Sequence, residues 1–149
     1  MNNSKMMMIG ALNKYLSSIA VTTLNMYNFH WNIKDPFFIV IHKKTEEYYE
    51  MLTNIFDEVA ERIKILEGYP IASLPEYCKI SVVKCAPSKD YTREEIISMT
   101  IYDFEILLAM TNEIAVLAQN TNDIVTLDLM TKYAAFLGKQ LWMLKSQLS

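Results

Sequence analysis

The chain is poor in turn-forming residues and in cysteine. Of its 149 residues only 3 are glycine and 4 are proline, too few for a protein built of many β-strands. Three of the prolines fall between residues 69 and 91, so long stretches elsewhere contain neither residue. The two cysteines, Cys78 and Cys85, form no CxxC pair and have no histidine nearby. We therefore interpret them as reduced, ordinary residues.

The chain also lacks a long hydrophobic run. The apolar stretch 6–12 stops at Asn13, well short of the ~20 residues that a membrane helix needs. It is a poor signal peptide as well, because no clear small-residue cleavage site follows it. We expect a cytoplasmic protein with no membrane association.

The charge balance is slightly acidic. Fourteen Lys and Arg residues stand against 17 Asp and Glu, which gives a formal net charge of −3. This balance argues against a general nucleic-acid binder, which is usually basic. Hydrophobic residues make up 52% of the chain, enough for a sizeable core, and the length suits one domain spanning residues 1–149.

The first half of the chain has the periodicity of two long helices. Apolar residues recur at helical spacing from about Ser4 to Trp31 and again from about Pro36 to Leu66. The pair Asp35-Pro36 separates the two segments, because a residue before proline avoids the helical conformation. Proline is favourable at a first helical position, and Gly68 with Pro70 is expected to end the second helix.

The second half predicts two more long helices. Residues 69–91 form a long connection in which Ser73–Tyr77 is expected to start a short helix. Thr92–Glu95 has the pattern of a capping box and opens a helix from about Thr92 to Gln119. A turn at 120–123 precedes a last helix that reaches about Gln147. The fold class is therefore all-α, a ferritin-like four-helix bundle with one long crossover that carries a short helix.

Candidate metal ligands lie in the first two helices. The chain has only two histidines, His30 and His42. Glu46 follows His42 by four residues, and Asp57 and Glu61 are also four apart, so each pair shares one face of a helix. Imidazole with carboxylate suits iron, zinc or manganese.

The two halves of such a site cannot meet within one chain. His42 and Asp57 are 15 residues apart on one helix, which corresponds to about 22 Å along the axis and ~60° around it. Two antiparallel copies of the second helix, crossing near Met51 and Leu52, would bring the halves together twice about a two-fold axis. If these residues bind metal together, the protein must therefore at least dimerise, and His30 could point into the same site.

An intra-bundle di-iron site is not expected. Such sites in ferritin-like proteins use Glu-x-x-His motifs, and the sequence contains none.

The spacing of these residues resembles the signature of the Dps family, whose members are also called mini-ferritins. The similar segment is His30-Trp31, Pro36-x-Phe38, His42-x-x-x-Glu46 and Asp57-x-x-Ala60-Glu61-Arg62-Ile63. The likeness is close over residues 30–70, and the helix pattern extends it across nearly the whole chain. Asp35 and Thr45 depart from it, because the family often has glycine and an aromatic residue there.

The resemblance implies a hollow shell of twelve subunits with ferroxidase sites at two-fold interfaces. His30 and His42 match the family's ligands from one subunit, with Glu46 at its acidic position. Asp57 and Glu61 match the ligands from the partner subunit. These five residues are accordingly the expected iron ligands.

Two tryptophans also match the family. Trp31 corresponds to the tryptophan beside the iron, and Trp142 to a second aromatic position near the site. Packing is an alternative role for both.

The resemblance further implies an activity. Ferrous ions bind at the interface and are oxidised, typically with hydrogen peroxide preferred over dioxygen, and the ferric product is stored inside the shell. Pairing two one-electron donors with one two-electron oxidant avoids the release of hydroxyl radical, so DNA would be protected from oxidative damage.

Acidic residues at the start of the last helix match the family's pore. In the family, residues at the positions of Asp123 and Asp128 line three-fold pores through which iron enters, where negative charge steers cations. The alternative is that these acids simply complement the helix dipole.

Other functions remain open. One is a nucleoid-associated DNA-binding protein without significant ferroxidase activity. Family members that condense DNA often use a Lys/Arg-rich tail, whereas residues 1–5 contain a single cation, which argues against direct DNA binding. A plain helical interaction module and a secreted relative that signals to host cells are further alternatives.

Overall fold

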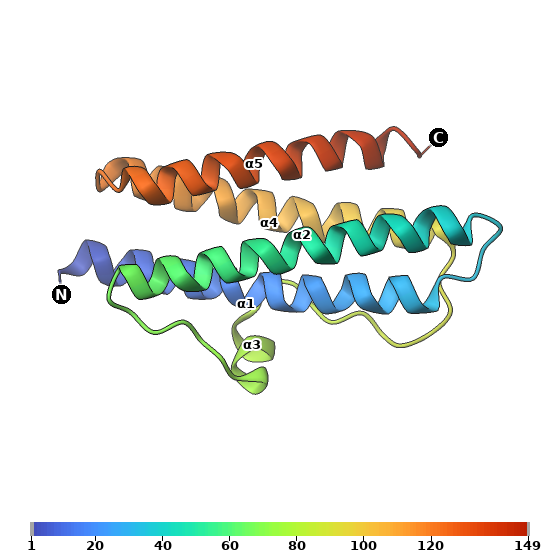
Figure 1. Cartoon of the computed structure of the whole chain (residues 1–149), viewed down its shortest axis with the longest axis horizontal. Helices are drawn as coiled ribbons and strands as arrows, with labels where there is room; N and C mark the ends of the chain where they lie inside the picture. The colour runs from blue at the N-terminus through green and yellow to red at the C-terminus, as the bar shows by residue number, and fades with distance from the viewer. Residues whose placement is uncertain (1, 149) are drawn as a thin grey trace.

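Two pairs of long helices form the bundle in the computed structural model, which describes residues 2–148 (Figure 1). The helices are α1 (Asn3–Asn32), α2 (Phe38–Ile65), α3 (Leu74–Ile80), α4 (Arg93–Asn120) and α5 (Ile124–Lys145). Helix α1 packs along α2, and α4 packs along α5, while the short helix α3 rests on α1. The predicted all-α bundle with a short helix in a long crossover is confirmed.

Local sequence signals set the helix starts. Thr92 and Glu95 form the predicted capping box: the Thr92 hydroxyl accepts from the Glu95 backbone N–H (3.2 Å), and the Glu95 carboxylate accepts from the Thr92 N–H (2.9 Å). The Asn2 side chain caps α1 by accepting from the N–H of Lys5 at 2.8 Å.

Helix α2 ends near Leu66 as predicted, but a residue other than glycine takes the left-handed conformation there. The chain reverses at Glu67, whose φ is 68°, and the Gly68 N–H donates to the Ile63 carbonyl at 2.9 Å. Gly68 has another role, because a Cβ there would lie 2.9 Å from the side chain of Ile9. Glycine thus permits the close approach of this turn to α1, while glutamate takes the left-handed position.

Pro36 does not occupy the first helical position as predicted. It lies in a turn before α2, which begins at Phe38. The reason is Asp35, whose carboxylate accepts from the N–H of Phe37 at 2.9 Å and from the N–H of Arg93 at 3.1 Å. These bonds lower the pKa of Asp35. The Asp35 side chain thereby fixes the connection between α1 and α2 (residues 33–37, called the hinge below) to the start of α4.

Backbone bonds reinforce this hinge. The Lys34 N–H donates to the Tyr91 carbonyl (2.8 Å), and the Tyr91 N–H donates to the Asn32 carbonyl (2.9 Å). The end of the crossover is therefore bound to the segment that separates the two histidine-bearing helices.

Asn25 holds the crossover against α1. Its amide donates to the Lys84 carbonyl (3.0 Å), and its oxygen accepts from the Ala86 N–H (2.9 Å). The same amide donates to the carboxylate of Asp103 on α4 at 3.0 Å. Burial raises the pKa of Asp103 to about 6, although the bond from Asn25 opposes the shift.

The core lies between the four long helices. Its largest fully buried side chains include Tyr15, Phe29, Tyr91, Phe104 and Tyr133. None of the helices within residues 2–148 combines the length and the hydropathy of a membrane span.

Candidate metal centre

The two histidines meet across the α1–α2 hinge. His30 lies in the last turn of α1, and His42 lies early in α2. Their rings are stacked, with centroids 3.6 Å apart and planes inclined by 15°. The structure thus brings together the only two imidazoles of the chain.

Each histidine orients the other. Nδ1 of His30 lies 2.6 Å from the carbonyl oxygen of His42, and Nδ1 of His42 lies 2.8 Å from the carbonyl oxygen of His30. A carbonyl oxygen can only accept, so each Nδ1 carries the proton and donates. In the neutral rings Nε2 therefore keeps its lone pair, which is the form that binds a metal ion.

Neighbouring side chains fix the ring planes. The Phe38 ring stacks on His42 with centroids 5.0 Å apart, and the Tyr49 ring meets His30 edge-on at 5.3 Å. The hydroxyl of Thr45 is buried and lies 3.3 Å from Nδ1 of His30. Thr45, one of the two departures from the family pattern, thus lies against the histidine pair.

Glu46 lies one helical turn beyond His42 and is exposed. Its carboxylate accepts a hydrogen bond from the Tyr49 hydroxyl at 3.3 Å. Burial and then the charge of Glu46 raise the pKa of Tyr49, which keeps the phenol protonated as a donor. Tyr27 stacks on Tyr49 with centroids 3.9 Å apart. Tyr49 was not among the predicted site residues, although its spacing of three residues from Glu46 places both on one helix face.

Asp57 and Glu61 lie on α2, away from the histidines. Both are exposed, and neither carboxylate accepts a hydrogen bond within residues 2–148. No three His, Cys, Asp or Glu side chains of this part of the chain converge into a metal-binding group. Within residues 2–148 of a single chain, the two groups of expected ligands therefore lie apart.

The expected crossing of two copies of α2 near Met51 and Leu52 stays a prediction, and the two residues differ in exposure. Met51 is 39% exposed and available to a second chain, but Leu52 is 1% exposed and belongs to the core of its own bundle. A contact between two copies of α2 would involve Met51 and not Leu52, because the side chains of adjacent helical residues point about 100° apart.

Both tryptophans are exposed. Trp31 is 64% exposed beside the histidine pair, with its ring 5.4 Å from that of Tyr27. Trp142 on α5 is 67% exposed and stacks on no other ring within residues 2–148. Core packing within one chain therefore does not explain either residue.

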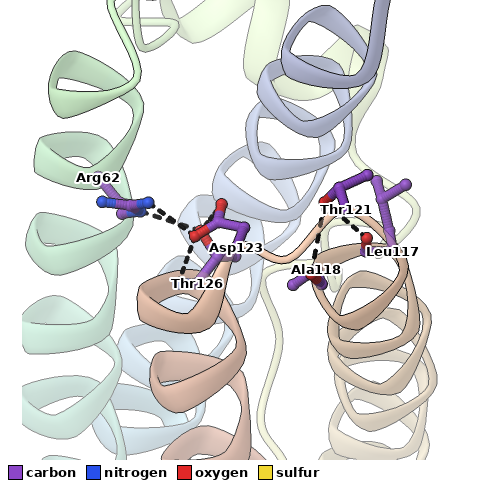
Figure 2. A network of polar contacts seen from close by, with 6 residues as sticks. All are labelled: Arg62, Leu117, Ala118, Thr121, Asp123 and Thr126. Atoms are coloured by element: carbon purple, nitrogen blue, oxygen red, sulfur yellow. Dashed lines mark hydrogen bonds and ion pairs between the residues drawn. The ribbon is translucent and has the colours of Figure 1, made fainter.

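The two acids at the start of α5 differ in their surroundings. Asp123 caps α5 by accepting from the Thr126 N–H at 3.0 Å and also accepts from the Arg62 guanidinium at 2.8 Å (Figure 2). Burial alone would raise its pKa, but the bonds from Thr126 and Arg62 lower it. Asp123 is thus occupied within its own chain, whereas Asp128 is exposed.

Arg62 and Thr126 complete this network. The Arg62 Nε donates to the Thr126 hydroxyl at 2.9 Å, and this hydroxyl donates to Asp123 at 2.5 Å. The preceding turn is stabilised by Thr121, whose hydroxyl donates to the Leu117 carbonyl at 2.8 Å (Figure 2). The network joins the end of α2, the helix that also carries Asp57 and Glu61, to the start of α5.

Comparison with known proteins places the chain among bacterial relatives. The sequence model of the ferritin-like domain family matches residues 9–149. The chain is 35% identical to DNA protection during starvation protein 2 of Bacillus anthracis over 141 residues, which cover 95% of this chain and 96% of that protein. It is 33% identical to the DNA protection during starvation protein of Helicobacter pylori over 91% of this chain and 95% of that protein.

Solved structures of similar proteins superpose on the chain over nearly its whole length. The Dps protein of Vibrio cholerae, described as a member of a broad superfamily of ferritin-like diiron-carboxylate proteins, superposes with a TM-score of 0.95 at 32% identity. The superposition covers 98% of this chain and 91% of that one. Antigen TpF1 of Treponema pallidum superposes with a TM-score of 0.97 at 30% identity, over 100% of this chain and 96% of that one.

Proposed function

The chain belongs to the Dps family within the ferritin-like superfamily, and from this premise we propose that it is a ferroxidase that stores iron. Its substrate is ferrous iron, its oxidant is hydrogen peroxide, and its product is ferric iron held inside a shell of twelve copies. Removal of iron and peroxide would protect DNA without direct DNA binding.

The histidine pair carries this proposal. His30 and His42 have their Nδ1 protons committed to carbonyl oxygens, so both Nε2 lone pairs are available to a metal ion. Glu46 on the next turn of α2 would add a negative charge, directly or through a water molecule. Neutral imidazoles with few carboxylates suit a transition-metal ion that must keep an open position for the oxidant.

A second copy of the chain would complete each site. Asp57 and Glu61 of the partner subunit would add the carboxylates that offset the rising charge as iron is oxidised. An exposed apolar surface beside the histidines supports pairing of two chains, because such a patch usually marks an interface. It comprises Trp31, Phe37, Phe38, Ile39 and Val40, which are 37–64% exposed.

The chemistry balances with two iron ions per peroxide. Two ferrous ions each give one electron, and hydrogen peroxide takes both with two protons to form two water molecules. Since no single electron is passed to peroxide alone, hydroxyl radical is not released. The ferric ions then leave the site toward the interior. The negative charge of Asp128 would steer further cations to the shell, and Asp123 would contribute less because its charge is offset by the ion pair with Arg62.

A ferrous titration tests the proposal. Ferrous iron is added anaerobically to the purified assembly, followed by hydrogen peroxide, and ferric absorbance and peroxide consumption are measured. We expect rapid oxidation at about two irons per peroxide, in line with the stoichiometry of a metal site that delivers two electrons. Oxidation no faster than that of iron in buffer would overturn the ferroxidase assignment.

A matched pair of variants locates the activity. The His30→Ala/His42→Ala variant should lose it, whereas Lys43→Ala, an exposed neighbour on the same helix, should keep it. Salt-sensitive DNA retardation with no iron oxidation would instead favour the nucleoid-binding alternative.

A further inference from the structure

A cavity lies where the returning crossover passes over α1 and α4. Its volume is about 360 Å³, within the range of small-molecule sites. Asn25 of α1 lines it, together with five crossover residues between Val82 and Pro87 and four residues of α4 between Ser98 and Asp103. None of the proposed iron ligands is among them, so the cavity is a feature separate from the histidine pair.

The wall of this cavity includes a buried acid, Asp103. The residue is 6% exposed, and one of its carboxylate oxygens accepts from the Asn25 amide at 3.0 Å. The second oxygen accepts no hydrogen bond within residues 2–148, and no Lys, Arg or His side chain of this part of the chain forms an ion pair with the carboxylate. Burial without a cation raises its pKa to about 6, so at neutral pH the cavity contains a negative charge that still lacks a counterion.

Asn25 fixes the position of this carboxylate. Its amide nitrogen donates both to Asp103 and to the Lys84 carbonyl, each at 3.0 Å, and its oxygen accepts from the Ala86 N–H at 2.9 Å. These bonds hold α1, α4 and the crossover together around the acid. The carboxylate is therefore oriented before any ligand arrives, which lowers the entropic cost of binding.

The other walls suit an organic cation. Ala86, Pro87 and Met99 supply apolar surface, and the Tyr102 side chain is 66% exposed, so its ring can face a positive charge. A divalent metal ion needs several oxygen ligands, whereas no three His, Cys, Asp or Glu side chains converge here within residues 2–148. An anion would be repelled by Asp103.

We propose that this cavity binds a small primary alkylammonium ion, whose charged group pairs with the second oxygen of Asp103 and whose alkyl chain packs on Met99 and Tyr102. Burial of the charge pair among apolar side chains makes the ion pair stronger than one at the surface. The site needs no iron and does not depend on the ferroxidase activity.

Lys84 opposes this ligand. It is the one Lys or Arg among the described residues that line the cavity, and its side chain is exposed. Its charge repels a bound ammonium ion, so Lys84→Ala should bind the ligand more tightly than the unaltered protein does.

Saturation-transfer NMR on the purified, iron-free protein tests the proposal. Butylammonium chloride is the probe, and 1-butanol, which has the same alkyl chain without the charge, is the matched control. We expect butylammonium to bind at one site per chain and 1-butanol to bind at least about tenfold more weakly, because only the cation pairs with the carboxylate. No binding of butylammonium, or equal binding of both compounds, would overturn the proposal.

Variants locate the site. Asp103→Asn should stay folded, because asparagine can still accept from Asn25, but should lose butylammonium binding; Asp90→Asn, which alters an exposed acid of the crossover, should keep it. Undiminished binding by Asp103→Asn would contradict the assignment. Binding seen only in Lys84→Ala would show that the Lys84 ammonium itself occupies the cavity. Tighter binding of N-acetyl-lysine methylamide than of butylammonium would replace the free amine with a lysine side chain of a partner protein.

Discussion

His30 and His42 hold each other in place: Nδ1 of each ring lies 2.6–2.8 Å from the backbone carbonyl oxygen of the other, and the rings stack at 3.6 Å. Removing either ring takes away the stacked neighbour of the other, while the backbone carbonyl that accepts from the remaining Nδ1 stays in place. The orienting carbonyls belong to the last turn of α1 and to the start of α2, so the position of these two helices relative to each other sets the orientation of both rings.

The first prediction concerns this coupling. We expect His30→Ala and His42→Ala each to reduce the rate of ferrous oxidation almost as much as the double substitution does, because each single change removes one imidazole ligand of the shared ion and the ring stacked on the other imidazole. Single-turnover rates of the three variants check this. Effects that add on a logarithmic scale would show that the two rings act independently.

The second prediction concerns the shared site. A His42→Ala chain and an Asp57→Ala chain should each be inactive in a homogeneous assembly. If each site takes His42 from one subunit and Asp57 from its partner, a mixed dimer keeps one intact site. Random co-assembly in equal amounts should then restore about a quarter of the oxidising sites. The control mixes His30→Ala with His42→Ala, which alter the same half-site and should restore nothing; recovery in the control would contradict the shared arrangement.

The third prediction concerns the link between α2 and α5. Replacing Arg62 with alanine should destabilise the protein by about 3–5 kcal/mol, because it leaves the largely buried Asp123 carboxylate without its cation. Thermal unfolding by circular dichroism measures the loss. The double variant Arg62→Ala/Asp123→Asn should recover part of it, whereas Lys132→Ala, which breaks an exposed ion pair with Glu58, should cost well under ~1 kcal/mol.

The fourth prediction concerns pH. Burial raises the pKa of Asp103 to about 6 in the folded state, above its ordinary value of 3.8. The folded protein therefore binds more protons than the unfolded chain between these values, and the free energy of unfolding falls as pH rises from about 4 to about 6. Asp103→Asn, which can still accept from Asn25, should raise stability above pH 6 by on the order of 1–3 kcal/mol.

The measurement is urea unfolding at pH 5 and pH 7.5. The gain in the Asp103→Asn variant should be larger at the higher pH. Asp90→Asn provides the matched control, because Asp90 is exposed and paired only with Lys34 at 3.6 Å. Equal gains at both pH values would show that Asp103 is not the group that titrates.

Helical periodicity predicted most of the fold. The expected helices and the capping box at Thr92 agree with the structure within one to three residues, because long periodic segments and local side-chain bonds depend on neighbouring residues. Pro36 was placed wrongly, since the pattern could not show that Asp35 would bond to Arg93, 58 residues away. The left-handed position at Glu67 was also missed, because glycine at 68 is the usual signal for such a turn.

The candidate site was predictable in its residue types but not in its geometry. Spacing alone showed that His42 and Glu46 share a face and that Asp57 lies too far away to join them. The reciprocal bonds between the two histidines depend on how the chain turns at the hinge, and no local pattern specifies that turn. The buried state of Asp103 likewise depends on a crossover that arrives from a distant part of the sequence.

The hinge that fixes the histidines gives the proposed site two unlike halves. Bonds from Asp35 and Tyr91 hold the imidazole half before any ion arrives, so capturing a ferrous ion there costs little conformational entropy. Within residues 2–148 the carboxylates of Asp57 and Glu61 accept no such bonds, so as ligands they would be able to change their mode of coordination. In the proposed site the rigid imidazoles of one subunit would thus lie opposite the mobile carboxylates of its partner. After oxidation the ferric ion would stay bound to the carboxylates and leave the imidazoles first, so iron would move through the site in one direction.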